Sequence, residues 1–282
     1  MGGLKHAPDL KNATIQRGKV ALAYTLIHPV PSKAAAIILH GLNDHKGRYR
    51  HLQEGLARAG YSSLAYDQRG FGLSDGKRAD VADYREFFED LSAIVKLLRK
   101  EHPHIQVVLI GHSLGGAIAA AYCIDHPNET DGLVLSSPAY DVPMLPFPLE
   151  PLAHLLYKCM PGAAFPYPNP DGKRSRDPAI DIAVAKDPLI AVKGTPRFYV
   201  EFRKMNRYLQ EHAQAITLPT LILQGGADSI VRAEGARALF RRLGHPKNHL
   251  HWYEGFYHEV FHEIGHEGVI ADLVGWLETA LA

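Results

Sequence analysis

The sequence has little of several features that would assign it to a special class of protein. Only two of its 282 residues are cysteines, Cys123 and Cys159, so it can build neither a disulfide framework nor a zinc ribbon. Its 31 basic and 30 acidic residues leave a net charge of +1. So balanced a charge implies no strongly basic face, which argues against nucleic acid as the main partner.

Long apolar runs are also missing. No stretch reaches the roughly 18 consecutive apolar residues that a membrane-spanning helix needs, and the first residues lack a signal peptide's apolar segment. The two cysteines are most simply free thiols of a reducing compartment, although one bridge between them stays open. We therefore expect a cytoplasmic protein without a transmembrane segment. Hydrophobic residues make up 46% of the chain, which is the usual share for a globular protein with a core.

Short apolar segments that alternate with helical patterns predict an α/β fold. Residues 14–16 and 20–27 flank a glycine turn and predict an opening β-hairpin. The later apolar runs lack strict alternation, which is typical of strands buried on both faces of a parallel sheet. These runs cover 35–39, 63–66, 106–110, 132–135, 220–223 and 250–253. Helical patterns over 84–98, 114–124 and 269–277 indicate helices that cover a mostly parallel central sheet.

One region interrupts this alternation, from about residue 143 to residue 214. Prolines crowd its first part, interleaved with apolar residues such as Phe147 and Leu155. Because a structureless loop of that length would be unusual, we predict an inserted, mainly helical cap over 143–214, on a core formed by 1–142 and 215–282. The apolar side chains of this cap have two interpretations. They pack against the core, or they form a rim that makes transient contact with lipid aggregates or a membrane surface.

The segment Gly111-His112-Ser113-Leu114-Gly115 lies between a predicted strand and a helix of small residues. A nucleophile elbow needs this setting, because its glycines allow a sharp turn that lifts the serine hydroxyl above the sheet. A tight turn with an inert serine is the alternative. Ser113 is therefore the candidate nucleophile.

A serine nucleophile needs a base that is itself held by an acid, and in this fold class the two follow the serine as Asp and then His. Asp228 and His258 each follow one of the last two predicted strands, where the sites of open α/β sheets lie. A turn aspartate is the alternative for Asp228. Among the 17 histidines, His251 and His262 are rivals of His258.

The segment His40-Gly41-Leu42 follows the apolar strand over 35–39. In such folds this point turns backbone N–H groups toward the oxyanion that forms during acyl transfer. We therefore assign the oxyanion hole to the backbone N–H groups of Leu42 and Leu114.

These motifs make the chain similar to the monoacylglycerol lipase-type, lysophospholipase-like serine hydrolases of the α/β-hydrolase superfamily. The resemblance covers nearly the whole chain, and its matching segments are 40–49, 67–76, 111–116, 136–138, 175–178, 187–189, 224–228 and 257–259. It implies an α/β-hydrolase fold with a cap. It also implies that Ser113, Asp228 and His258 cleave carboxylic esters through an acyl-enzyme, without a cofactor.

The resemblance further implies an apolar acyl channel under the cap, with a polar end where Asp44 and Arg48 receive glycerol hydroxyls. His40, Gly41 and His112 complete the expected substrate-binding residues. The expected substrate is a lipid ester, first of all a monoacylglycerol that yields a fatty acid and glycerol. A general carboxylesterase or a lysophospholipase with the same triad is the alternative.

A rival motif overlaps the triad histidine. Residues 258–262 match H-E-x-x-H, and residues 262–266 match it again. On one helix, two such histidines can bind zinc with the glutamate as base. Such a match is common by chance in a chain this rich in histidine, and Gly265 interrupts the second copy. We therefore expect no metal, and we place His262 and His266 on a helix surface that faces water.

Overall fold

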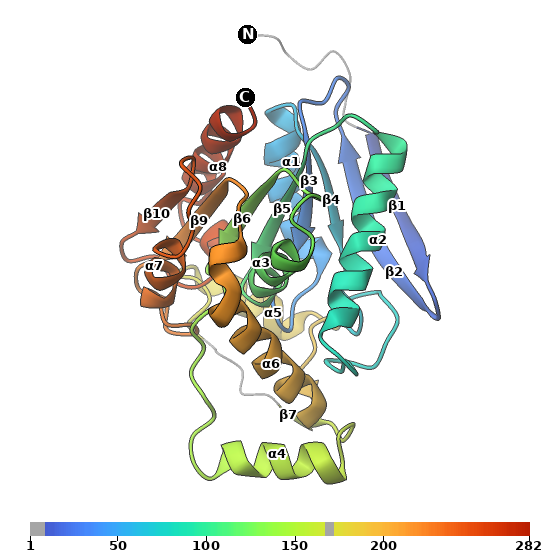
Figure 1. Cartoon of the computed structure of the whole chain (residues 1–282), viewed down its shortest axis with the longest axis vertical. Helices are drawn as coiled ribbons and strands as arrows, with labels where there is room; N and C mark the ends of the chain where they lie inside the picture. The colour runs from blue at the N-terminus through green and yellow to red at the C-terminus, as the bar shows by residue number, and fades with distance from the viewer. Residues whose placement is uncertain (1–8, 167–171) are drawn as a thin grey trace.

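The computed structural model describes residues 9–166 and 172–282, and an eight-stranded sheet lies at its centre (Figure 1). The strand order is β1-β2-β4-β3-β5-β6-β9-β10. The strands are β1 (Asp9–Arg17), β2 (Val20–His28), β3 (Ala35–Leu39), β4 (Ser62–Tyr66), β5 (Val107–His112), β6 (Gly132–Ser136), β9 (Thr220–Gly225) and β10 (His249–Tyr253). The hairpin β1-β2 and the pair β2-β4 are antiparallel, and the other neighbours are parallel. The predicted, mostly parallel sheet is therefore confirmed.

The parallel strands are buried on both faces, as their unbroken apolar runs predict. In β3, Ile37 and Leu39 point into one apolar layer, while Ala36 and Ile38 point into the other. The first layer is covered by α2 (Arg85–Glu101), α3 (Leu114–Asp125) and α6 (Pro196–His212), and the second by α1 (Arg50–Arg58) and α8 (His266–Ala280). The remaining short helices are η1 (Lys46–Tyr49), η2 (Ala213–Ala215), α7 (Glu234–Phe240) and η3 (Val260–His262).

Helix α3 packs very closely on the sheet. A Cβ atom at Gly115 would overlap the carbonyl oxygens of Leu39 and His40, so only glycine fits there. Ten of its twelve residues are buried, among them a run of alanines from 119 to 121. The close approach fixes the start of α3, where Ser113 lies, against the end of β3.

Between β6 and β9 the chain leaves the sheet, and we call residues 143–214 the insertion. It contains α4 (Leu149–Cys159), β7 (Phe165–Pro166), α5 (Pro178–Lys186), β8 (Lys193–Gly194) and α6. The short antiparallel pair of β7 and β8 was not predicted. The apolar residues of the insertion are buried in one helix and left exposed in another. Helix α6 buries Phe198, Met205 and Leu209 in the core, whereas none of the residues of α4, all of them described, is buried.

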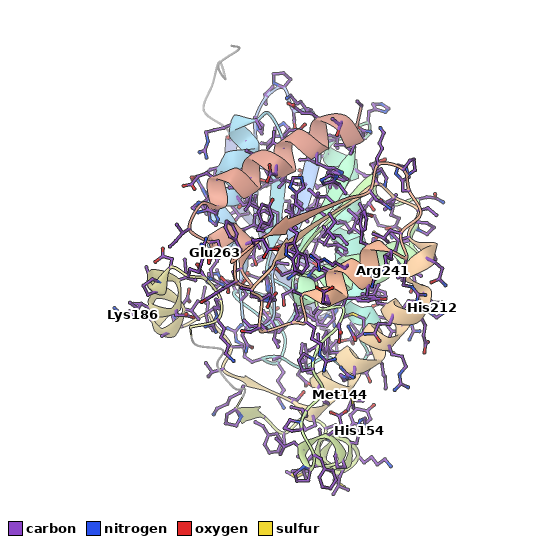
Figure 2. All side chains as sticks on the ribbon, turned by 90° about the vertical axis from the view of Figure 1, so that its left-hand side faces the viewer. Met144, His154, Lys186, His212, Arg241 and Glu263 are labelled. Atoms are coloured by element: carbon purple, nitrogen blue, oxygen red, sulfur yellow. The ribbon has the colours of Figure 1, made fainter. Side chains whose placement is uncertain are left out.

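Helix α4 lies at the end of the molecule away from the C-terminus (Figure 1). Figure 2 marks this end by Met144 and His154. Several large apolar side chains here are exposed, namely those of Met144, Phe147, Leu149, Leu152, Leu155 and Met160. Within 9–166 and 172–282, no helix combines the length and the apolar character needed to cross a membrane. Cys123 is buried, Cys159 is exposed, and both are free thiols.

Candidate active site

Ser113 lies at the sharp turn between β5 and α3. Its backbone has φ +52° and ψ −114°, a conformation that residues other than glycine rarely adopt. Hydrogen bonds from the N–H of Ser113 to Ser136 O and from the N–H of Ala139 to Ser113 O hold this turn, at 2.9 and 3.0 Å. A Cβ atom at Gly111 would overlap the Gly115 carbonyl, which explains the glycine on that side. The geometry is that of the predicted elbow.

Asp228 and His258 come together from the loops after β9 and β10. The Nδ1–H of His258 donates a hydrogen bond to Asp228 Oδ2 at 2.7 Å. The other carboxylate oxygen, Oδ1, accepts from the N–H groups of Ile230 and Val231 at 2.9 and 3.2 Å. Burial opposes the charge of Asp228, but the charge and hydrogen bond of His258 and these two N–H groups outweigh it, so its pKa is lowered. Asp228 is therefore suited to orient an imidazole and to stabilise its protonated form.

His112 precedes the serine and packs against the triad histidine. The centres of the His112 and His258 rings are 4.8 Å apart, and His112 Nδ1 lies 3.2 Å from Ser136 Oγ. Burial first, and then the proximity of His258, lower the pKa of His112 to about 3. At neutral pH His112 is therefore an uncharged neighbour, and it does not compete as the base.

The loop after β3 touches the elbow at the place that the oxyanion-hole prediction requires. A Cβ atom at Gly41 would lie 3.1 Å from the His112 ring and 3.3 Å from Ser113 Cβ. Neither Leu42 nor Leu114 donates its backbone N–H to another group within the described part of the chain. Both N–H groups are thus free to donate a hydrogen bond beside the serine.

Ser113 and His258 line one cavity of about 340 Å³. Its walls are mainly apolar, with a polar side formed by Asn43, Asp44, Arg174 and Glu259. The apolar lining consists of Leu42, Leu114, Ala139, Val142, Phe198, Phe202, Ile230 and Val231. An apolar cavity with a few polar groups at one side is suited to a ligand that has an apolar tail and a polar head.

The predicted substrate-binding residues divide into two groups. Gly41, Asp44 and His112 line the cavity. Of the described residues around it, His40 and Arg48 do not line the cavity, so the prediction of direct contact receives no support for these two. His40 is fully buried, and its Nε2 accepts the N–H of Gln68 at 3.0 Å.

Arg48 is bound by two buried carboxylates behind the polar wall. Its guanidinium lies 3.1 Å from Asp44 Oδ1 and 2.5 Å from Glu259 Oε2. Burial disfavours the charge of each carboxylate, but Arg48 prevails and lowers the pKa of both, well below the usual range in the case of Asp44. Arg174 of the insertion also pairs with Glu259, at 3.6 Å. This ion cluster ties the residue after His258 to the loop after β3 and to the insertion.

The overlapping H-E-x-x-H motifs do not form a helical metal site. His258 lies in a loop, His262 ends the short η3 turn, and only His266 begins a helix, α8. The expectation that His262 faces water is wrong, because its side chain is only 7% exposed and its Nε2 is 2.9 Å from Arg48 O. No group of three or more His, Cys, Asp or Glu side chains within 9–166 and 172–282 is arranged to hold a metal ion.

Three residues of the polar wall, Asn43, Arg174 and Glu259, are absent from the predicted substrate-binding residues. A signal for Arg174 and Glu259 was present in the sequence. Glu259 follows His258 directly, and Arg174 directly precedes the Ser175–Pro178 segment that carries the family resemblance. What the sequence does not show is that the two side chains meet.

The fold and the elbow define an α/β hydrolase of the serine type, and comparisons with known proteins agree. Residues 30–265 match the family model described as serine aminopeptidase, S33. A monoacylglycerol lipase of Mycolicibacterium smegmatis is 33% identical over 268 residues, 94% of this chain and 95% of the relative. The monoglyceride lipase of Homo sapiens is 31% identical over 246 residues, 82% of this chain and 81% of the relative. A crystal structure of Paleococcus ferrophilus monoacylglycerol lipase is similar with a TM-score of 0.83 and 28% identity, covering 96% of this chain and 99% of that one.

The chain therefore belongs to the serine aminopeptidase S33 family of α/β hydrolases. This confirms the resemblance inferred from its motifs and makes the protein a serine hydrolase.

Proposed function

We propose that the protein is a monoacylglycerol lipase, which releases a fatty acid and glycerol through an acyl-enzyme. The observation that carries the proposal is the 2.7 Å hydrogen bond between His258 and Asp228, with Ser113 at its elbow in the same cavity. The names of the Mycolicibacterium and human relatives, a monoacylglycerol and a monoglyceride lipase, support the substrate class.

The proposed reaction uses three side chains and two backbone groups. His258 takes the proton of the Ser113 hydroxyl while its oxygen attacks the acyl carbonyl, and Asp228 holds the imidazole tautomer and stabilises its charge. The N–H groups of Leu42 and Leu114 stabilise the oxyanion. His258 then gives the proton to the departing glycerol oxygen, and finally activates the water that frees the fatty acid.

The cavity favours short to medium acyl chains. Its volume of about 340 Å³ is near the lower end of the roughly 300–1,000 Å³ that ligand pockets usually have. Phe198 and Phe202 on α6 of the insertion face the acyl chain, so the insertion acts as the cap of a core formed by 1–142 and 215–282. On the polar side, Asp44 receives a glycerol hydroxyl, while Arg48 orients Asp44 without touching substrate.

A peptide substrate fits the cavity less well, although the family carries the name of an aminopeptidase. Capture of a peptide's terminal ammonium needs a carboxylate whose charge is not already neutralised by a cation, whereas a glycerol hydroxyl needs only a remaining acceptor site. Asp44 already accepts from Arg48, from Tyr49 Oη at 2.8 Å and from the His45 N–H at 2.7 Å. Glu259 is paired with two arginines. A general carboxylesterase or a lysophospholipase remains the alternative, because both would use the same triad.

The exposed apolar side chains of α4 and its preceding loop support a further part of the proposal. Phe147 and Leu155 present apolar surface at the insertion's outer end. We propose that this surface makes transient contact with lipid aggregates that deliver the substrate. A cytoplasmic location stays a prediction.

Replacement of the nucleophile tests the proposed function. We expect Ser113→Ala to lower kcat on a medium-chain monoacylglycerol by about 10⁶-fold, because the acyl-enzyme cannot form. Ser137→Ala is the matched control, since the buried Ser137 hydroxyl has no hydrogen-bond partner within the described residues. Turnover of the same order in Ser113→Ala and wild type would refute the proposal. Faster release from lysophosphatidylcholine or from a simple alkyl ester than from the monoacylglycerol would select one of the alternatives.

A further inference from the structure

Gln224 makes a contact with Asp228 that the proposed reaction has not used. It lies on β9 and is fully buried. Its Nε2–H donates to Asp228 Oδ2 at 3.2 Å, the same oxygen that accepts the His258 Nδ1–H at 2.7 Å. The amide also donates to Gly225 O at 3.0 Å.

The other end of the same amide is unsatisfied. Gln224 Oε1 is buried and has no hydrogen-bond partner among the residues described. A buried polar atom without a partner destabilises a fold, and an apolar side chain of similar length would avoid that cost. The stability of the fold therefore does not account for a glutamine at this position.

Asp228 accounts for both the residue type and its orientation. Turning the amide over would place Oε1 against the Asp228 carboxylate, so the donor must face Asp228 and Oε1 is left without a partner among the residues described. The backbone donors Ile230 and Val231 bind only Oδ1. Besides His258 itself, Gln224 is the only described group that donates to Oδ2.

We infer that Gln224 is a positioning residue for the triad, whose amide holds Asp228 Oδ2 in line with His258 and favours the ionised carboxylate. This inference rests on the proposed function, because it needs Asp228 to act on His258. On this inference, Gln224 serves the reaction, and its unpaired oxygen lowers the stability of the fold.

The other ionisable groups around the pair leave this contact unchanged. His112 faces the His258 ring from the elbow at 4.8 Å. Glu259, beside His258, is held by Arg48 and Arg174. None of these side chains hydrogen-bonds to the Asp228 carboxylate within the described chain, so a change at Gln224 acts on Asp228 without removing another partner.

The test compares two buried glutamines, one assigned to the triad and one to the stability of the fold. For Gln224→Met we expect kcat to fall about tenfold with unchanged KM, because the base is affected and binding is not. We expect the acid limb of the pH–rate profile to move about one unit higher, because a donor that favours the ionised carboxylate is lost. The melting temperature should stay within about 2 °C of the wild type, because the unpaired oxygen is removed and Gly225 O keeps the Asp228 N–H.

Gln53→Met is the matched control. Gln53 is buried on α1, and its amide donates to Thr25 O and Ser63 O, both at 3.0 Å, far along the chain from the triad. This variant should lose several degrees of melting temperature and keep the wild-type pH profile.

Two further variants keep the inference falsifiable if Gln224→Met does not fold. Gln224→Glu keeps the shape, but two carboxyl groups in contact cannot both ionise, so its acid limb should move further than that of Gln224→Met. In an Asp228→Asn background, the loss caused by Gln224→Met should largely vanish, because the two residues act as a unit.

A folded Gln224→Met protein with the wild-type acid limb and a kcat within twofold of wild type would overturn the inference. So would an undiminished effect in the Asp228→Asn background. If Ser113→Ala is inactive in the same assays, only the role of Gln224 fails. If Ser113→Ala is active, the proposed function itself fails.

Discussion

Helices α3 and α4 are of nearly equal length, with twelve and eleven residues, but they meet opposite environments. Ten residues of α3 are buried, whereas α4 has none among its residues, all described. The small residues of α3 let it approach the sheet until only glycine fits at position 115. Three leucines of α4, Leu149, Leu152 and Leu155, are instead exposed. The comparison indicates that the reacting groups lie on the densely packed core, while α4 is the loosely packed part of the insertion.

The two halves are joined near the site by charge as well as by apolar packing. Glu259, next to His258, pairs with Arg48 of the core and with Arg174 of the insertion. A second link connects His45 Nε2 with Asp187 of the insertion at 2.8 Å. These contacts tie the insertion to the loops that carry His258 and His45.

The largest expected change in stability is at this junction. Arg48→Ala leaves the carboxylates of Asp44 and Glu259 buried without their main cation, so the free energy of unfolding should fall by about 3–5 kcal/mol. Arg50→Ala is the control. Arg50 pairs with Glu54 at the surface, and its loss should cost less than about 0.5 kcal/mol. Urea unfolding measures both, and equal losses would contradict the assigned role of the cluster.

The same cluster predicts a pH dependence of stability. The folded-state pKa values of Asp44 and Glu259 are lowered, so their stabilisation is present above the unfolded pKa of about 4 and is lost as pH falls through the folded values. Unfolding of the wild type should therefore become easier below about pH 4. In Arg48→Ala this part of the acid dependence should be smaller, and an unchanged dependence would contradict the assignment.

Truncation of one side chain in each of α3 and α4 should change the free energy of unfolding by a smaller amount and by different amounts in the two helices. Ile118 on α3 is fully buried, so Ile118→Ala should lower the free energy of unfolding by about 2–4 kcal/mol through lost burial and a cavity. Leu155 on α4 is 57% exposed, so Leu155→Ala should change it by less than about 0.5 kcal/mol. If Leu155→Ala were as costly, the side chain of Leu155 would have to be buried against other side chains, and the comparison between the helices would fail.

The smallest expected effect concerns the outer surface of the insertion. Phe147 is 88% exposed, so Phe147→Ser should leave the melting temperature unchanged. Its activity on substrate above the critical micelle concentration should fall about fivefold, because apolar contact with the aggregate is lost. Activity on a monomeric ester should match that of the wild type. A parallel loss on both substrates would place Phe147 in the catalytic cycle and refute the proposed lipid contact.

The sequence predicted those features that depend on local pattern. The unbroken apolar runs gave strand limits within about two residues of those observed, except for the longer β1. Glycines at 111 and 115 indicated the elbow, because a Cβ atom at either position would overlap neighbouring backbone atoms. Residue type alone therefore gives the signal. Asp228 and His258 followed from their positions after strands, since the carboxyl ends of parallel strands share one edge of the sheet.

The remaining parts of the site depend on contacts between distant segments. Arg48 and Glu259 are 211 positions apart, and no local pattern pairs them. His262 was placed in water because its spacing from His258 suits a helix. The chain forms only the η3 turn there and buries the ring beside Arg48. The amide of Gln224 likewise acquires its role only when the loop after β9 returns to it.

Covalent labelling of the nucleophile tests the central claim most directly. A fluorophosphonate ester should add one phosphonyl group per chain, and mass spectrometry of the digested protein should locate it on Ser113. Ser113→Ala should take up no label, and His258→Ala should react at least about 10³-fold more slowly because the base is missing. Label on another residue, or esterase activity that survives in a protein fully modified at Ser113, would contradict the account.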